Sequence, residues 1–245
     1  MTKFRNPEQP LYFLVRENML KRLGEGEWEP GERIPTEPEL AKIFSVSVGT
    51  VRKAIEDLVT EKILVRRARI GTTVALHQEH NQFSTFFNFQ SKSGDPLKVS
   101  AQLLSFGKTK ATKELANIFK LPEKESLIVI DNLRLIHNEP AMYDRIWLPE
   151  KLFPQMDRKV FEGRPDSIYA LFQRQFKITV LRIYEQIEAI NPPDFVQQEL
   201  KLKKTDASLK ISRHAMTYGD EVIEYRHRYV NTSRCRYQNQ IGLKE

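Results

Sequence analysis

Arginine, lysine and hydroxyl side chains gather in two short segments of the first third of the chain. Arg66, Arg67 and Arg69 fall within a run of four residues. The segment upstream combines small, hydroxyl and basic residues: Ser47, Val48, Gly49, Thr50, Arg52 and Lys53. Such donors bind phosphate oxygens, so the two segments predict contact with a nucleic-acid backbone. An isolated arginine cluster is more often a solvated surface, so the elements that carry the segments must decide between these interpretations.

Three predicted helices position the first of these segments. Apolar residues spaced by four predict a helix over 11–23. Thr36 and Glu39 form a capping box for a second helix that ends near Phe44. Ser47 is the expected N-cap of a third helix. That third helix has the clearest helical spacing of apolar residues in the chain: Val51, Ala54, Ile55, Leu58 and Val59.

The short turn before the third helix and a hairpin after it predict a winged helix-turn-helix. The third helix turns its donor-rich start outward, as a recognition helix does toward base edges. Alternation over 63–74 predicts the hairpin, and Arg67, Arg69 and Gly71 at its tip suit a minor groove. We therefore predict that residues 1–76 bind double-stranded DNA, with Thr36 among the contacting residues.

The remainder of the chain has the pattern of an α+β domain. Residues 77–96 are polar and predict a linker to a domain over 97–245. Strands are predicted over 127–136, 141–148, 178–190, 209–218 and 222–230, and helices over 110–119, 167–176 and 193–202. Strands joined by hairpins and interrupted by helices indicate an antiparallel sheet with helices packed on it.

One predicted strand carries polar side chains on an otherwise apolar face. Asn132 and Arg134 alternate with the apolar residues of this face, and a buried charge needs a partner. Arg134 either pairs with Asp144 or Glu224 from neighbouring strands or receives an anionic group of a small molecule. Both hypotheses stand, since a carboxylate could hold Arg134 until a ligand arrives. The candidate residues for such an effector site are Phe86, Asn132, Arg134, Tyr143, Asp144, Ser167, Tyr169 and Glu224.

Several stretches resemble a known family of regulators. Residues 35–41 (PTEPELA), 44–55 (FSVSVGTVRKAI) and 63–74, with matches at 10–12 and 30–31, resemble the winged helix of GntR-family regulators. The rest is similar to the HutC subfamily, whose C-terminal effector domain, the UTRA domain, resembles chorismate lyase in fold. The segments that carry this second resemblance are 133–135, 139–144, 148–149, 167–169 and 223–225. The resemblance implies a homodimeric regulator, repressing by family habit, that binds operator DNA and a small-molecule effector.

The chain departs from the family pattern at positions that would face DNA or effector. Pro38 and Val48 stand where the family often has arginine, and Arg69-Ile70 stands where it has glycine-lysine. Asn132 replaces the first arginine of a two-arginine strand motif. The family's operator sequence therefore does not carry over to this chain, and a phosphorylated effector is disfavoured.

Composition limits the partners and the compartment. The 245 residues include 39 Lys and Arg against 32 Asp and Glu, a net charge of +7, which permits a nucleic-acid partner. Residues 1–75 hold only 13 of these basic residues against 11 acidic ones, so local placement carries the argument. The chain has no apolar run of bilayer length, no apolar leader and a single cysteine, Cys235, which together predict a cytoplasmic protein with no membrane partner.

No catalytic, metal or cofactor site is predicted. The five histidines lack ligand spacing with cysteine or acidic residues, and no phosphate loop or nucleophile elbow occurs. Two alternatives remain: an enzyme using Asp144 and Glu224 around Arg134, and a basic RNA-binding or scaffold protein. The ordered helix, turn, helix and wing, with both N-caps in place, favour a DNA-binding regulator.

Overall fold

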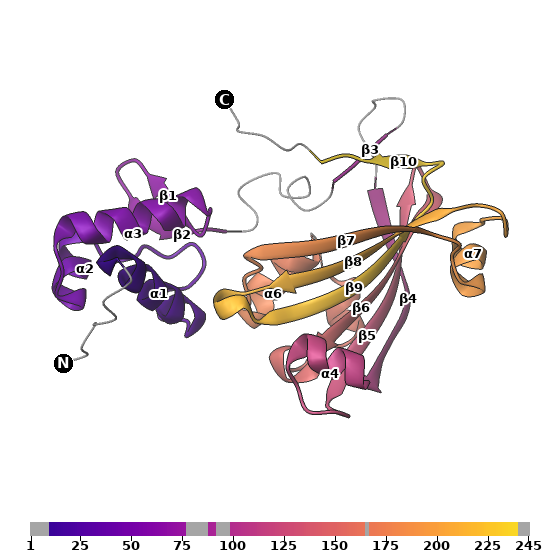
Figure 1. Cartoon of the computed structure of the whole chain (residues 1–245), viewed down its shortest axis with the longest axis horizontal. Helices are drawn as coiled ribbons and strands as arrows, with labels where there is room; N and C mark the ends of the chain where they lie inside the picture. The colour runs from indigo at the N-terminus through magenta and orange to yellow at the C-terminus, as the bar shows by residue number, and fades with distance from the viewer. Residues whose placement is uncertain (1–9, 77–87, 92–98, 165–166, 240–245) are drawn as a thin grey trace. The chain divides into compact units, whose positions relative to one another are not determined.

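The computed structural model describes residues 10–76, 88–91, 99–164 and 167–239. These residues divide into two compact units (Figure 1). The N-terminal unit contains residues 10–76 together with 172–181 and 217–220. The remaining described residues form the C-terminal unit. Most of the predicted linker over 77–96 lies outside the described residues, although Phe89–Ser91 within it forms strand β3.

The N-terminal unit contains the predicted helix-turn-helix and wing. Its elements are α1 (Leu11–Gly24), α2 (Glu37–Phe44), α3 (Val48–Thr60), β1 (Leu64–Arg67) and β2 (Gly71–Val74). The strands β1 and β2 pair in antiparallel register, with Arg67 opposite Gly71. The three helices and the hairpin predicted from apolar spacing are therefore confirmed, each within a few residues.

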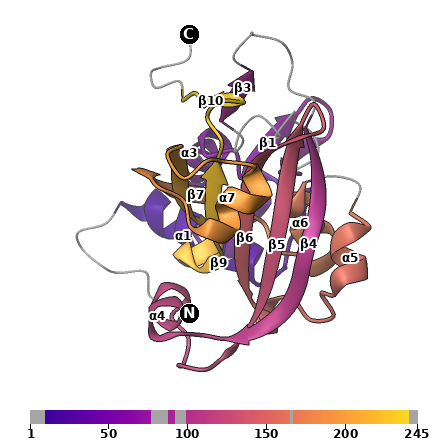
Figure 2. The same ribbon diagram turned by 90° about the vertical axis from the view of Figure 1, so that its right-hand side faces the viewer.

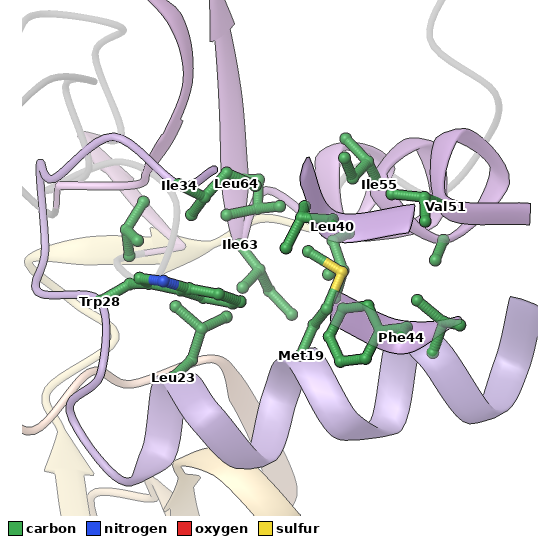
Figure 3. Close-up of a cluster of buried hydrophobic side chains, with 14 of the residues drawn as sticks. Met19, Leu23, Trp28, Ile34, Leu40, Phe44, Val51, Ile55, Ile63 and Leu64 are labelled. Carbon is green, nitrogen blue, oxygen red and sulfur yellow. The ribbon is translucent and has the colours of Figure 1, made fainter. Parts of the chain in front are cut away.

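The apolar side chains of the three helices and the hairpin form one hydrophobic core in this unit. Figure 3 shows Met19 of α1 between Leu40 and Phe44 of α2, with Trp28 over Leu23. All five of these side chains are almost completely buried. Burying a side chain of this size contributes roughly 1.5–3 kcal/mol, so this core fixes α3 and the hairpin in place.

The C-terminal unit is built on a six-stranded antiparallel sheet with strand order β4-β5-β6-β9-β8-β7 (Figures 1 and 2). The strands are β4 (Val99–Lys110), β5 (Ser126–Ile136), β6 (Glu139–Pro149), β7 (Arg182–Ile190), β8 (Ser208–Met216) and β9 (Val222–Val230). A separate pair joins β3 to β10 (Cys235–Tyr237). The predicted α+β class with an antiparallel sheet is confirmed.

Helices pack against both faces of this sheet. The helices are α4 (Lys113–Phe119), α5 (Arg158–Glu162), α6 (Ile168–Phe176) and α7 (Asp194–Leu200), with 3₁₀ turns at Glu150–Leu152 and Tyr218–Asp220. Leu115 of α4 packs with Tyr225, and Val196 of α7 packs with Tyr229. Both tyrosines lie on the same face of β9. Side chains alternate between the faces of a strand, so the intervening Glu224, Arg226 and Arg228 project from the opposite face. No helix among the described residues is long and apolar enough to cross a bilayer.

Candidate functional site

The start of α3 is held by a hydroxyl cap. Ser45 adopts a left-handed conformation, φ +56°, that turns the chain sharply between α2 and α3. The Ser47 hydroxyl oxygen accepts from the Thr50 amide at 3.1 Å and lies 2.8 Å from the Thr50 hydroxyl oxygen. The predicted N-cap is therefore present. Val48 and Gly49 follow it on the exposed surface.

The carboxylate of Glu37 contacts both α3 and the wing. Glu37, in the first turn of α2, accepts from Arg52 Nε of α3 at 2.9 Å. Its other oxygen lies 3.4 Å from Nη2 of Arg66 in β1. Both guanidinium groups are about half exposed, with side-chain exposures of 57% and 48%. This arrangement gathers two cations at one surface while leaving them open to a phosphate.

The wing tip has the backbone geometry of a tight hairpin. Arg69 has φ +66° and Gly71 has φ +105°, both in the left-handed region that favours glycine. A Cβ atom at Gly71 would come within 3.0 Å of Arg33 Nε. Arg33, which the sequence arguments missed, thereby adds a fourth basic side chain near the tip. Arg67 Nε donates to the Thr73 hydroxyl at 3.1 Å, which orients that arginine along the hairpin.

Two other predicted DNA-binding residues, Thr36 and Lys53, contact neighbouring side chains. The Thr36 amide and hydroxyl both donate to Glu39 Oε2 at 2.7 Å, so the carboxylate arm of the predicted capping box is in place. Lys53 Nζ lies 3.5 Å from Asp57 and over the ring of Tyr12 at 5.8 Å. These side chains lie near the exposed surface, where phosphate can compete for them.

A cluster of arginines around one aspartate lies at the centre of the C-terminal unit. Asp144 is fully buried and accepts from Arg228 Nε at 2.6 Å and from Arg228 Nη2 at 2.9 Å. Arg134 Nε donates to Asp144 at 3.0 Å, and Arg226 Nη1 lies 3.4 Å away. Of the two partners left open for Arg134, the structure therefore gives Asp144. Glu224 instead accepts from Arg226 at 2.7 Å.

Among the described residues, this arginine cluster brings three guanidinium groups to two carboxylates. Three guanidinium groups, those of Arg134, Arg226 and Arg228, face the carboxylates of Asp144 and Glu224. Burial, together with repulsion from Arg228, lowers the pKa of Arg134 to about 10, so it stays protonated at neutral pH. Burial alone would raise the pKa of Asp144, but attraction to Arg228 and Arg226 outweighs it and holds that pKa well below its ordinary value. Asp144 therefore remains ionised at neutral pH, bound to the arginines that surround it.

Two buried acceptors at this cluster have no hydrogen-bond donor among the described residues. They are Asn132 Oδ1 and Glu224 Oε2. Asn132 pairs directly with Asp144 across β5 and β6, so the two side chains share a face. A buried acceptor without a donor is costly, and a ligand carrying hydroxyl or amino groups would satisfy both atoms.

The first turn of α6 brings two further predicted residues into place. The Ser167 hydroxyl accepts from the Ala170 amide at 3.2 Å and so caps the start of the helix. The Tyr169 hydroxyl accepts from Arg213 Nη1 at 3.4 Å. Burial and the charge of Glu224 raise the pKa of Tyr169, which keeps the phenol neutral beside the cluster.

One candidate effector residue, Tyr143, does not join the cluster. Tyr143 neighbours Asp144 in β6, so its side chain projects from the other face, where its hydroxyl accepts from Arg145 at 3.1 Å and its ring meets Phe195. Strand alternation thus corrects the expectation that Tyr143 lines the same pocket as Asp144. Phe86 lies outside the described residues.

Sequence reasoning missed Arg226 and Arg228, the two arginines that complete the cluster. Both follow Glu224 at intervals of two in a strand that was predicted correctly, so alternation alone would have placed all three on one face. Arg213 of β8 was also missed; it pairs with Glu185 of β7 at 2.6 Å.

Family models match both units of the chain. Residues 96–236 match the model of the UTRA domain, and residues 11–74 match that of bacterial regulatory proteins of the gntR family. The chain belongs to the GntR family. This GntR-family regulator has the domain pairing expected of the HutC subfamily, a helix-turn-helix unit followed by a UTRA domain.

Relatives of this GntR-family regulator match it over most of its length. The chain is 26% identical over 219 residues to the probable fructoselysine utilization operon transcriptional repressor of Escherichia coli K12, covering 89% of each protein. It is also 26% identical to the mannosyl-D-glycerate transport/metabolism system repressor MngR of the same organism, covering 91% of this chain and 92% of the relative.

Solved structures show the same fold. PhnF from Mycobacterium smegmatis aligns with a TM-score of 0.55 at 19% identity, covering 94% of this regulator and all of PhnF. A GntR-family transcriptional regulator from Bacillus cereus aligns with a TM-score of 0.53 at 21% identity, covering 59% of this chain and 99% of that structure. The fold derived from the strand order is thus shared with regulators of this family.

Proposed function

We propose that this regulator is a cytoplasmic repressor that binds operator DNA as a homodimer and releases it when a hydroxylated organic anion occupies the UTRA domain. The observation that carries the effector half of the proposal is the gathering of three arginines on the buried carboxylate of Asp144. Guanidinium groups form strong charge-assisted hydrogen bonds with carboxylates, so an anion entering this cluster would be bound by groups that are already positioned there. Repression is proposed because the relatives reported above are named repressors.

The chemistry of the cluster supports an effector with two kinds of group. The gathered guanidinium groups suit a carboxylate, while Asn132 Oδ1 and Glu224 Oε2, which have no donor among the described residues, suit hydroxyl or amino groups. Fructoselysine and mannosyl-D-glycerate, the compounds in the relatives' names, each combine a sugar with a carboxylate. We propose that the effector of this chain belongs to the same chemical class.

The N-terminal unit supports the DNA half of the proposal. Arg52 and Arg66 meet at Glu37 on the exposed surface of α3 and the wing. In a dimer, two such units would dock on half-sites about 34–36 Å apart, and the effector would change their spacing or mobility. A coupling of about 1–3 kcal/mol between the two sites is sufficient for such a switch.

Catalysis is not part of the proposal. A general base needs a pKa near the operating pH, whereas the arginines hold the pKa of Asp144 far below it. Tyr169 is buried with a raised pKa and is a poor proton donor at neutral pH. We therefore propose that the arginine cluster binds a ligand without transforming it.

The deciding experiment is a thermal-shift screen of the full chain against sugar-linked carboxylates, simple carboxylates, amino-acid derivatives and sugar phosphates. A ligand at 100 times its dissociation constant should stabilise the protein by about 2.7 kcal/mol. We expect stabilisation by hydroxylated carboxylates and a matching loss of operator binding in gel-shift assays. Stabilisation confined to uncharged sugars would contradict the proposed role of the arginine cluster.

A further inference from the structure

We infer that Val48 contacts the 5-methyl group of a pyrimidine in the major groove and so makes one operator position select thymine. This inference rests on the proposed function, because it assumes that α3 is the recognition helix. It concerns a residue at which the chain departs from the arginine common in its family.

Val48 is the first residue of α3 and is exposed. Its exposure is 37%, whereas Val51 one turn later is completely buried. A β-branched residue gains nothing in helix propensity at such a position. No packing or propensity argument within the N-terminal unit therefore accounts for an apolar side chain at the point where α3 would meet DNA.

The surface beside Val48 is open to close approach. Gly49 follows it, and a Cβ atom built at Gly49 would meet only Ser47 Oγ, at 3.8 Å. With no side chain at Gly49, a base pair could approach the helix backbone and come into van der Waals contact with Val48. A larger residue at position 49 would hold the duplex away from it.

The polar residues around Val48 are engaged with neighbouring side chains. The Thr50 hydroxyl lies 2.8 Å from the Ser47 hydroxyl, and Arg52 is held by Glu37 at 2.9 Å. Val48 itself has no hydrogen-bonding side chain, so any discrimination it exerts must come from apolar contact. In the major groove the methyl group of thymine is the apolar feature of the base edges, and 5-methylcytosine carries the same group.

The test begins with selection of bound sequences from random DNA duplexes by the full chain. Each thymine of the selected consensus is then replaced singly by deoxyuridine, which lacks only the methyl group. At one position per half-site we expect affinity to fall about fourfold, as for losing burial of one methyl-sized group. In Val48→Ala the ratio between thymine and deoxyuridine duplexes at that position should fall close to one.

A second arm distinguishes the two sources of the methyl group. The sensitive base pair is replaced by cytosine paired with guanine, with and without a 5-methyl group on the cytosine. If methylation of the cytosine raises the affinity of the wild type about fourfold and leaves that of Val48→Ala unchanged, Val48 contacts the methyl group of either base. If only thymine responds, the contact is confirmed as specific to the thymine base pair.

Leu11→Ala is the matched control, because Leu11 is an aliphatic residue of α1 with 43% exposure. It should leave every ratio between thymine and deoxyuridine unchanged. Circular dichroism should show Val48→Ala folded, since alanine favours a helix. Equal deoxyuridine penalties in wild type and Val48→Ala would overturn this inference alone, whereas a selection that yields no consensus would overturn the proposed function.

Discussion

At the scale of single residues, Glu37 contacts both arginines of the proposed DNA surface. Its carboxylate contacts Arg52 at 2.9 Å and Arg66 at 3.4 Å. A carboxylate there holds both cations in place but also repels the phosphates that those cations would bind. The two effects oppose each other, so the balance between affinity and sequence selectivity depends on this residue.

We expect Glu37→Gln to bind random duplex DNA several-fold more tightly, with a steeper dependence on salt, because one negative charge is removed beside the phosphate sites. Selectivity for the operator over random DNA should fall. Fluorescence anisotropy at several salt concentrations measures both quantities. Glu61→Gln, which removes the partner of Arg16 at the C-cap of α3, is the control. Weaker binding to all sequences would show instead that Glu37 mainly positions the arginines.

Arg52 is the second residue of the proposed DNA surface whose replacement gives a testable prediction. Arg52→Ala should weaken binding almost equally for every DNA sequence and flatten the salt dependence by about one phosphate contact. The reason is that a guanidinium group with 57% exposure, held at the edge of α3 by Glu37, is placed for the backbone. Anisotropy titrations on operator and random duplexes provide the measurement. A large change in base preference would assign Arg52 to base contacts.

Asp144 controls the stability of the effector unit. Asp144→Asn removes the carboxylate that three arginines contact, and breaking a buried pair costs about 3–5 kcal/mol. The folded pKa of Asp144 lies below its unfolded value of about 3.9, so its contribution is present at neutral pH and is lost as pH falls below about 4. Denaturant unfolding should thus show the gap between wild type and variant narrowing from pH 6 to pH 3. Asp194 is exposed, and Asp194→Asn should unfold with nearly the same free energy as the wild type at every pH.

At the scale of elements, α3 and its turn were predictable because every local signal agreed. The cap Ser47, the turn at Ser45 and the apolar spacing from Val51 onward all specify the same helix, as the structure confirms. Strand β4 was missed, because its residues are mostly exposed or half-buried and show no clean alternation. The five-residue helix α5, capped by Asp157, is too short for periodicity to reveal.

Gly49 gives an element-scale prediction with opposite effects on folding and binding. Gly49→Ala should stabilise α3 by about 0.5–1 kcal/mol, because alanine has the better helix propensity and the new Cβ atom meets nothing closer than 3.8 Å. The same methyl group should weaken operator binding by obstructing close approach of DNA. Thermal unfolding and gel-shift assays on the same preparation test both signs. Unchanged DNA affinity would indicate that this surface of α3 does not approach the bases.

The cluster around Asp144 shows that predicting the strands does not predict which side chains pair across them. Arg134, Asp144 and Glu224 could be proposed from their strands, but which carboxylate Arg134 takes depends on register, and register pairs Asp144 with Arg228 and Asn132. A register shift of one residue would move every side chain of a strand to the opposite face of the sheet. Tyr143, one position before Asp144, lies on that opposite face for the same reason. The long-range order of the sheet, in which β9 lies between β6 and β8, was not readable from the sequence.

At the scale of the whole molecule, the proposed function requires the effector and operator sites to be coupled. Coupling of this kind is reciprocal: if an effector weakens operator affinity by some factor, operator DNA weakens effector affinity by the same factor. A factor of about 5–150 corresponds to the usual range of coupling free energy. The two binding constants therefore test the coupling without any assumption about how the units are arranged.

Arg134→Gln should separate these two activities. Arg134 contacts Asp144 at 3.0 Å but keeps 14% of its side chain exposed, which makes it the most accessible of the three clustered arginines to an entering anion. We expect operator affinity without effector to stay within about twofold, while thermal stabilisation by the effector and release of DNA are both lost. Arg145→Gln is the matched control, because Arg145 pairs with Asp131 beside Tyr143 on the opposite face of the same sheet. A normal effector response in Arg134→Gln, or an equal loss in both variants, would contradict the assignment of the arginine cluster as the effector site.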